Sequence, residues 1–237
     1  KENPDKEVVF FAVGFETTAP ANALSVIHAK REHLSNYSIL TSHVLVAPAM
    51  EAILNDDDCV VNGFLAAGHV CAVTGLSEYY PIVDKYQIPI VVTGFEPVDL
   101  LQGIYMVVKQ LEENRHCLEN QYSRIVPEEG NPSAIQIMHD VFEVSDREWR
   151  GIGILPNSGF EVKGEYSLYD AKKKFDLELK SKENNNGCIA GEILRGLKKP
   201  KQCPKFGKEC TPVFPLGAPM VSSEGACAAY YHFSNIE

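Results

Sequence analysis

The chain has 237 residues, of which 45% are hydrophobic and 23% charged. This is the composition of an ordinary globular protein, and it excludes intrinsic disorder, a collagen-like fibre and a coiled coil. The net charge of −10 argues against a nucleic-acid binder. The longest apolar runs are far shorter than the roughly 20 residues that span a bilayer, and no secretory signal opens the sequence. We therefore expect a cytoplasmic protein with no membrane and no nucleic-acid partner.

The first half of the chain alternates between predicted strands and helices. Continuous apolar, β-branched runs predict buried strands at 8–13, 38–46 and 88–94. Thr18 is the predicted N-cap of a first helix. Apolar residues at helical spacing predict further helices at 48–54, 77–86 and 97–114, whereas the glycine-rich stretch 63–75 predicts a strand end and a loop.

This alternation favours an α/β fold with a parallel sheet covered on both faces, in Rossmann- or flavodoxin-like αβα layers. The pattern continues more loosely with strands at 122–126 and 151–155, helices at 132–143 and 167–175, and a loop at 156–166. A polar linker is predicted at 178–187. We therefore expect a parallel α/β domain at 1–118, a second, partial α/β unit at 119–180, and a loop-rich, cysteine-rich module at 181–237.

The tripeptide Gly-Phe-Glu occurs three times, and its first two copies each follow a predicted strand and precede a helix. In a parallel sheet the carboxyl ends of the strands share one edge, where ligands bind. The candidate cleft-lining residues are therefore Gly14, Glu16, Thr17, His69 and Glu96. The alternative is structural: glycine ends strands, glutamate favours the start of a helix, and His69 is a packed or solvated histidine.

Four of the seven cysteines, Cys188, Cys203, Cys210 and Cys227, lie in the last fifty residues. In a reducing compartment a late cysteine cluster indicates a metal site rather than disulfides. Four thiolates hold either an iron–sulfur cluster or a tetrahedral zinc, and the spacing lacks the C-x2-C pair of zinc ribbons. The sequence contains no P-loop and no dinucleotide-binding glycine motif, so it gives no support to an ATPase or a nicotinamide enzyme.

Six stretches of the sequence closely resemble the hydrogenase maturation factor family HypD, and the resemblance extends over essentially the whole chain. The stretches are GFETTAPANA (14–23), VVTGFEPVDLLQGI (91–104), NQYSRIV (120–126), SLYDAKKKF (167–175), CIAGEILRGLKKPKQCPKFGKECTP (188–212) and PLGAPMVSSEGACAAYY (215–231).

The resemblance implies a function as well as a fold. Cys188, Cys203, Cys210 and Cys227 match the four cysteines that bind a 4Fe-4S cluster in that family. The family acts with its small partner HypC as the scaffold on which an Fe(CN)2CO unit is built, with cyanide supplied by HypE, for NiFe hydrogenase. This implies a metallocofactor-assembly scaffold with a redox role rather than a conventional turnover enzyme.

Two family motifs are missing from the 237 residues. These are the iron-holding cysteine followed by Gly-Gly-His-Thr-His, and a Cys-Pro-Val-Cys pair. We therefore expect a truncated chain that is inactive alone, in which Cys71 is a small buried thiol rather than a substitute iron ligand. Two alternatives remain open: an iron–sulfur electron-transfer protein and a zinc-stapled interaction module.

Overall fold

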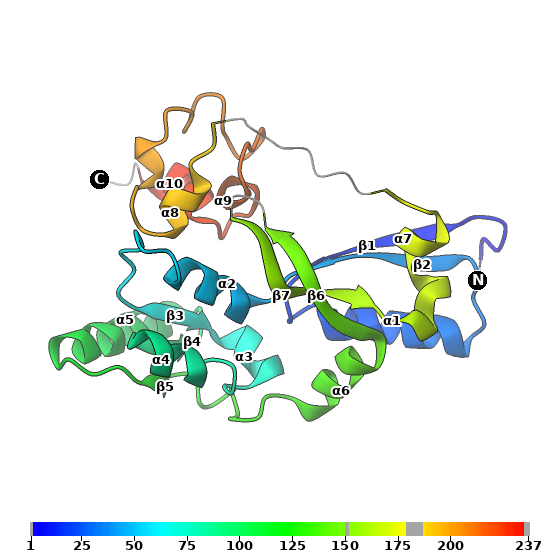
Figure 1. The fold of residues 1–237 in the computed structure, drawn as a ribbon, viewed down its shortest axis with the longest axis horizontal. Helices are drawn as coiled ribbons and strands as arrows, with labels where there is room; N and C mark the ends of the chain where they lie inside the picture. Colours follow the sequence, from blue (N-terminus) through cyan, green and yellow to red (C-terminus); the bar gives the residue numbers. More distant parts are fainter. Residues whose placement is uncertain (1, 150–151, 179–186, 235–237) are drawn as a thin grey trace. The chain divides into compact units, whose positions relative to one another are not determined.

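The computed structural model describes residues 2–149, 152–178 and 187–234. The chain separates into two compact units (Figure 1). The first comprises Lys1–Ala49, Asn62–Arg147 and Pro156–Leu179, and the second comprises Met50–Val61, Glu148–Leu155 and Lys180–Glu237. Most of the predicted linker lies outside the described residues, and the predicted division of the chain near residues 118 and 180 stays a prediction.

The first part of the chain alternates strands and helices, as expected. Its elements are β1 (Val8–Gly14), α1 (Ala19–Arg31), β2 (Tyr37–His43), α2 (Val46–Leu54), β3 (Phe64–Ala67), α3 (Gly68–Thr74), α4 (Tyr80–Tyr86), β4 (Ile90–Thr93), α5 (Pro97–Glu112) and β5 (Leu118–Asn120). Thr18 is the N-cap residue of α1, as predicted, although its side chain makes no capping hydrogen bond. The prediction of a loop after β3 is wrong, because α3 begins there directly.

The later elements are shorter. They are α6 (Pro132–Val141), β6 (Phe142–Trp149), β7 (Gly153–Val162), a 3-10 helix (Gly164–Tyr169), α7 (Ala171–Lys174), α8 (Ala190–Leu194), a second 3-10 helix (Pro200–Gln202), α9 (Ala218–Val221) and α10 (Ala226–Phe233). None of the described helices is long and apolar enough to cross a membrane.

Two small parallel sheets define a mixed α/β fold. β1 pairs with β2 in register from Val8 opposite Tyr37 to Gly14 opposite His43. In the second sheet β4 lies between β3 and β5, and both pairs are parallel. β6 and β7 form a separate two-stranded sheet.

β4 is buried on both faces as predicted, with Ile90, Val91 and Val92 all 0% exposed. The prediction that the strand at 8–13 is equally buried is wrong. Its large apolar side chains are 46–58% exposed, and only Ala12 is buried. Within the described residues β1 pairs only with β2 and its apolar side chains on both faces of the sheet are largely uncovered, whereas β4 has strands on both sides and is covered on both faces.

Two other strand predictions are corrected. Residues 122–126 form a turn, in which the backbone N–H of Val126 donates to the carbonyl of Tyr122 over 3.0 Å, and the strand is instead β5. The prediction of a loop at 156–166 is wrong for most of its length: β7 runs to Val162, because it pairs with β6, and a 3-10 helix begins at Gly164. β6 was missed because its sequence, FEVSDREW, is mostly polar.

A hydrophobic core ties α1, β2, α6 and β7 together. Its fully buried members include Ala23 and Val26 of α1, Ile39 of β2 and Val141 at the end of α6. Phe142 and Phe160 stack there with their ring centroids 5.6 Å apart. The same core includes Ala12 of β1 and Ala19 of α1, which flank the first Gly-Phe-Glu motif.

Candidate functional site

The four late cysteines line one pocket in the second unit. They come from separate elements: Cys188 precedes α8, Cys203 ends a 3-10 helix, Cys210 lies in a loop and Cys227 lies in α10. The pocket is closed by apolar residues, including Ile189, Ile193, Phe206, Pro219 and Met220. The structure therefore brings together the whole predicted ligand set.

A tight loop brings Cys203 and Cys210 to the same pocket. The backbone N–H of Phe206 donates to the carbonyl of Cys203, and that of Cys210 to the carbonyl of Lys205, each over 3.0 Å. Gly207, at φ +69°, allows the chain to turn back and donate to the carbonyl of Cys210. These local bonds fix the spacing of two of the four thiols.

The pocket tolerates no bulk beside its first cysteine. A Cβ atom added at Gly217 would overlap the Sγ atom of Cys188. Next to it, the backbone N–H of Leu216 donates to the Sγ atom of Cys210 over 3.4 Å. A glycine that leaves space for one sulfur and an amide that bonds another are features that fit a thiolate-ligated group.

The thiols also interact electrostatically. Burial, and then the proximity of Cys188, Cys210 and Cys203, raise the pKa of Cys227 to about 11. Because neighbouring thiolates repel one another, a cationic centre bound among the four cysteines would favour their deprotonation. Within the described part of the chain, no group of three or more His, Cys, Asp or Glu side chains is gathered around the position of a single metal ion.

At the end of β1, Glu16 is buried and only 2% exposed. Its Oε1 atom accepts a hydrogen bond from the backbone N–H of Val46 over 2.8 Å, whereas Oε2 has no partner among the described residues. Burial raises the pKa of Glu16 to about 7. Gly14 has φ +146° and lies against Thr18, and Thr17 is half-buried. This carboxyl group is therefore poised between its neutral and charged forms near neutral pH.

His69 and Glu96 both lie at the carboxyl edge of the second sheet. His69 packs edge-on against Phe95, with ring centroids 4.7 Å apart. Glu96 follows Phe95 and accepts a hydrogen bond from the Tyr122 hydroxyl over 3.2 Å. Both side-chain positions are exposed. The sequence analysis named both as candidate cleft-lining residues, and the structure places them on either side of the Phe95 ring, after the ends of β3 and β4.

Sequence reasoning missed an ion-pair network on the same edge. Asp99 in the first turn of α5 is bound by Arg124 through two hydrogen bonds of 2.9 and 2.6 Å, and by Gln121 through one of 2.7 Å. Arg124 also lies over the Tyr122 ring, 4.5 Å from its centroid. The only available signal was Asp99, three residues after the second Gly-Phe-Glu motif.

Glu16 and Glu96 follow strands of two different sheets, β1 and β4. Glu16 lies close to α3, the helix that follows β3 of the second sheet. Glu16 interacts electrostatically with the thiol of Cys71 in α3. Cys71 is fully buried and hydrogen-bonded to the Tyr79 side chain, and burial raises its pKa to about 11. Cys71 is therefore a buried, packed thiol of the first unit. Whether Glu16 and Glu96 share one cleft stays a prediction.

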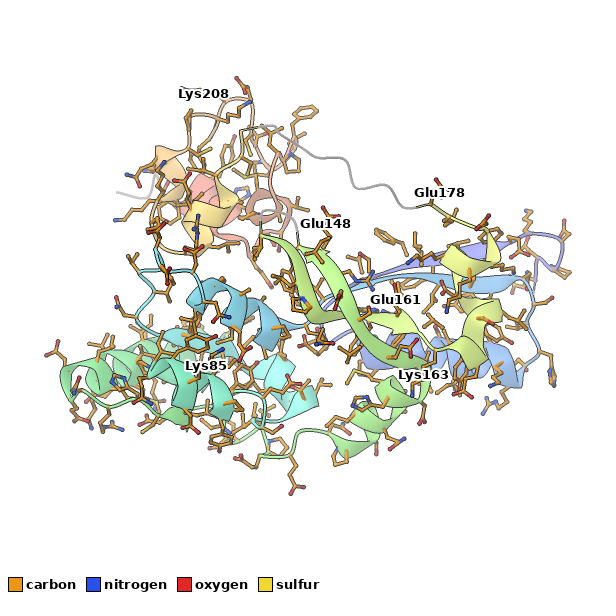
Figure 2. All side chains as sticks on the ribbon, in the orientation of Figure 1. Lys85, Glu148, Glu161, Lys163, Glu178 and Lys208 are labelled. Carbon is orange, nitrogen blue, oxygen red and sulfur yellow. The ribbon has the colours of Figure 1, made fainter. Side chains whose placement is uncertain are left out.

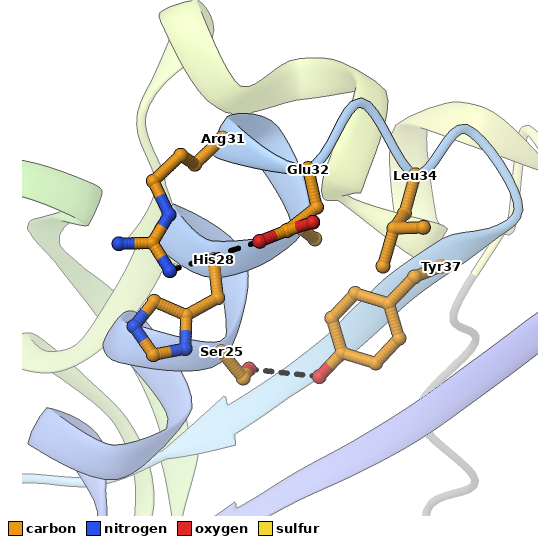
Figure 3. Close-up of a pocket in the computed structure, with 7 residues that line it drawn as sticks. Ser25, His28, Arg31, Glu32, Leu34 and Tyr37 are labelled. Carbon is orange, nitrogen blue, oxygen red and sulfur yellow. Dashed lines mark hydrogen bonds and ion pairs between the residues drawn. The ribbon is translucent and has the colours of Figure 1, made fainter. Parts of the chain in front are cut away.

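The third Gly-Phe-Glu motif lies inside β7, not at a strand end. Its Glu161, labelled in Figure 2, pairs with Lys172 of α7 over 3.2 Å. A separate cavity of about 390 Å³ lies at the end of α1 (Figure 3), where Ser25 bonds the Tyr37 hydroxyl over 2.8 Å and Arg31 pairs with Glu32. None of the predicted site residues lines this cavity.

The fold and the thiol pocket define a mixed α/β protein with a candidate metallocentre near its last helices. The family model HypD, described as "Hydrogenase formation hypA family", matches residues 1–234. The chain therefore belongs to the HypD family of hydrogenase maturation factors, which confirms the resemblance.

Similar proteins of known name belong to the same family. The chain is 44% identical over 240 residues to the hydrogenase maturation factor HypD2 of Bradyrhizobium diazoefficiens, covering 98% of this chain and 63% of the relative. It is 44% identical over 238 residues to HypD of Rhodobacter capsulatus and 44% identical over 239 residues to HypD of Azotobacter vinelandii, with the same two coverages. The chain thus spans about 63% of the length of these relatives.

Proposed function

We propose that this chain takes part in hydrogenase maturation as a piece of the scaffold on which an Fe(CN)2CO unit is assembled. A HypC-like protein is the proposed co-scaffold, a HypE-like protein the proposed source of cyanide, and the cytoplasm the proposed location. Family membership supports this proposal. The iron unit is the cargo of such a scaffold, and the carboxyl edges of the two sheets, with Glu16 and Glu96, are the proposed surfaces that face it.

The single observation that carries the redox part of this proposal is the convergence of Cys188, Cys203, Cys210 and Cys227 on one pocket. We propose that they hold a 4Fe-4S cluster, in which each thiolate binds a different iron. When bound, such a cluster supplies single electrons. Apolar residues line the pocket, and we expect them to limit the access of water to the reduced centre.

Two further groups of the chain adjust this pocket electrostatically. The Leu216 N–H withdraws electron density from the Cys210 sulfur, and hydrogen bonds of this kind raise the reduction potential of a cluster. Lys205 pairs with Glu209 over 2.8 Å, and its positive charge also interacts with Cys203. Both effects offset negative charge on the thiolates.

Anaerobic reconstitution of the 237-residue chain with iron and sulfide tests the cluster. We expect about four irons and four sulfides per chain, the stoichiometry of a cubane cluster. Cys203→Ser and Cys210→Ser are expected to lose most of both, whereas Cys117→Ser, an exposed cysteine outside the pocket, serves as the matched control. Loss of the cluster in a Cys59→Ser, Cys71→Ser double variant, with both pocket variants retaining it, would contradict the ligand assignment.

The same preparation separates the two alternative functions. Bound zinc without acid-labile sulfide would favour a zinc-stapled interaction module. A complete cluster in a chain that fails to bind a HypC-like protein would favour an electron-transfer protein without scaffold activity. Binding of a HypC-like protein by the cluster-loaded chain is the result that the scaffold proposal requires.

A further inference from the structure

Helix α8, which begins two residues after the first pocket cysteine, takes part in two separate sets of contacts. Its N-cap residue Ile189 and its Ile193 line the cysteine pocket. Leu194 and Arg195 instead line a cavity of about 190 Å³, together with Asp56 from the segment that follows α2. Both sets of contacts lie within the second unit. The helix therefore connects the pocket to the segment Met50–Val61 of the same unit.

One ion pair joins α8 to this segment. The Nη1 atom of Arg195 donates to the Oδ2 atom of Asp56 over 2.6 Å, across 139 residues of sequence. The two side chains are only 26% and 35% exposed, so solvent screens the pair less than it screens a surface pair. A charge-assisted hydrogen bond of this length is among the stronger polar contacts that a protein makes.

Further hydrogen bonds orient both partners of the pair. The Nε atom of Arg195 donates to the carbonyl of Gly191 over 3.1 Å, and the carbonyl of Arg195 accepts from the backbone N–H of Val60 over 3.1 Å. On the other side, the Oδ1 atom of Asp56 accepts from the backbone N–H of Asp58 over 3.1 Å. Each charged group is thus oriented by its own segment of the chain, which lowers the entropy lost on pairing.

Helix α8 depends on such contacts, because it is too short to be stable by itself. It has five residues, and helices shorter than about 12 residues are marginal in water without tertiary packing. Ile193 holds the helix at the pocket, and Arg195 holds it at the segment after α2. Because Cys188 lies two residues before α8, the position of its thiol follows the position of the helix.

The space for the Cys188 sulfur is also narrow. A Cβ atom at Gly217 would overlap it, so the backbone of the opposite loop lies directly beside the sulfur. A small displacement of α8 therefore moves this thiol away from its place among the other three cysteines of the pocket.

From these observations we propose that the ion pair between Arg195 and Asp56 positions Cys188: it holds α8 so that this thiol completes the four-cysteine site. The inference rests on the proposed function, because it assigns a role to two residues toward the same cysteine pocket. Arg195 and Asp56 are positioning residues, which act through α8.

Hydrogen exchange of the metal-free 237-residue chain tests whether the pair holds α8. Arg195→Gln is expected to speed amide exchange in residues 190–197 by about threefold or more, because the pair no longer opposes local opening. Arg195→Lys keeps the charge and should recover part of the protection. Lys198→Gln is the matched control, since it breaks a 2.7 Å pair with Glu192 that joins the helix only to the residues that follow it. Unchanged exchange in Arg195→Gln, or an equal increase in Lys198→Gln, overturns the inference.

The reconstituted cluster tests whether Cys188 is the thiol that the pair positions. A cubane cluster that lacks one cysteine ligand readily loses an iron, and electron paramagnetic resonance detects the oxidised cluster of about three irons that remains. Arg195→Gln is expected to raise this signal about threefold or more over wild type, toward that of Cys188→Ala. The double variant should match Cys188→Ala alone, because an absent thiol cannot be misplaced. A further loss of iron in the double variant would show a general destabilisation and would overturn the inference.

Failure of the proposed function has a different signature. A wild-type chain that binds no cluster contradicts the proposed function, and Co²⁺ then replaces iron as the probe of the same four thiols. Arg195→Gln is expected to reduce the visible absorption of cobalt bound by four thiolates, whereas Lys198→Gln leaves it unchanged. Equal absorption in the wild type and Arg195→Gln overturns the inference, and the exchange measurement decides in every case because it needs no metal.

Discussion

The guanidinium group of Arg124 binds both carboxylate oxygens of Asp99, at 2.9 and 2.6 Å, across the 25 residues that separate them in sequence. This pair joins the first turn of α5 to the turn that follows β5. It therefore fixes the carboxyl edge of the second sheet, where His69 and Glu96 lie.

Loss of Arg124 should destabilise this edge. In Arg124→Gln the nearly buried Asp99 carboxylate loses its cationic partner and both hydrogen bonds from the guanidinium group, so we expect a lower melting temperature. Arg115→Gln, which breaks exposed ion pairs with Glu113 and Glu119, is the control and should lower the melting temperature less. Hydrogen bonding to Arg124 lowers the pKa of Asp99 below the value of 3.8 for an ordinary Asp. The pair therefore stabilises the folded chain fully at a pH above 3.8, and this stabilisation is lost as the pH falls through the lowered pKa. Equal effects of the two variants would contradict the role of the pair.

His43 should make the protein less stable in acid. It is fully buried beside Phe142 and Phe160, and burial lowers its pKa from 6.5 to about 4. Between pH 6.5 and about pH 4 the His43 side chain binds a proton in the unfolded chain but not in the folded chain. Stability is therefore expected to fall by about 3 kcal/mol as the pH falls from 6.5 to 4. Denaturant unfolding of wild type and His43→Gln at both pH values should show a smaller difference in the variant.

Glu16 should have the opposite effect. Its pKa rises from 4.5 to about 7, so the folded chain binds a proton that the unfolded chain releases. Its favourable contribution is complete below pH 4.5 and is lost as the pH rises through 7. Glu16→Gln is expected to be more stable than wild type at pH 8, by about 1 to 3 kcal/mol, and nearly equal at pH 4.5. A variant destabilised equally at both pH values would show that Glu16 is ionised when folded.

The glycine beside the first cysteine should be required for the cluster. In Gly217→Ala the added methyl group meets the Cys188 sulfur, so we expect reduced iron and sulfide after reconstitution and a weaker visible absorption band. Gly164→Ala is the matched control, because a Cβ atom there meets nothing within 4 Å. Full iron content in Gly217→Ala would mean that Cys188 moves freely or is not a ligand.

The two strands that look alike in sequence should respond differently to a charge. Val91→Asp places a carboxylate in the middle of the fully buried β4 and is expected to unfold the protein, since an unpaired buried charge costs several kcal/mol. Phe11→Asp in β1, at a residue 58% exposed, should leave the chain folded. Far-ultraviolet circular dichroism spectra of the two variants show directly which of them is folded. Unfolding of both variants would contradict the exposure of β1.

The missing iron-holding motif leads to a functional prediction. The 237 residues contain no cysteine followed by Gly-Gly-His-Thr-His. The chain purified with a HypC-like protein is therefore expected to show no cyanide or carbonyl stretching bands in the infrared, and by itself not to restore hydrogenase maturation in cells lacking HypD. A full-length relative is the positive control. Clear bands from this chain would show that another of its residues holds the iron.

The sequence by itself determined the family, the four pocket cysteines as a candidate ligand set, and those elements with a strong local signal. β4 and α5 are examples, because a continuous β-branched run and a proline-initiated apolar helix specify their conformation locally. It also named His69 and Glu96 as candidates at strand ends, since the carboxyl ends of parallel strands in one sheet lie on the same side.

Only the tertiary structure decided which strand is buried, which polar groups meet and which face of a helix is left open. β1 and β4 have similar apolar sequences, yet their exposure differs because it depends on which distant parts of the chain cover the two faces of each strand. Asp99 and Arg124 meet through the turn after β5, and Asp99 and Gly103 of α5 lie on the side of the helix that faces the sheet. Such relationships arise from long-range packing, which a local pattern of residues does not encode.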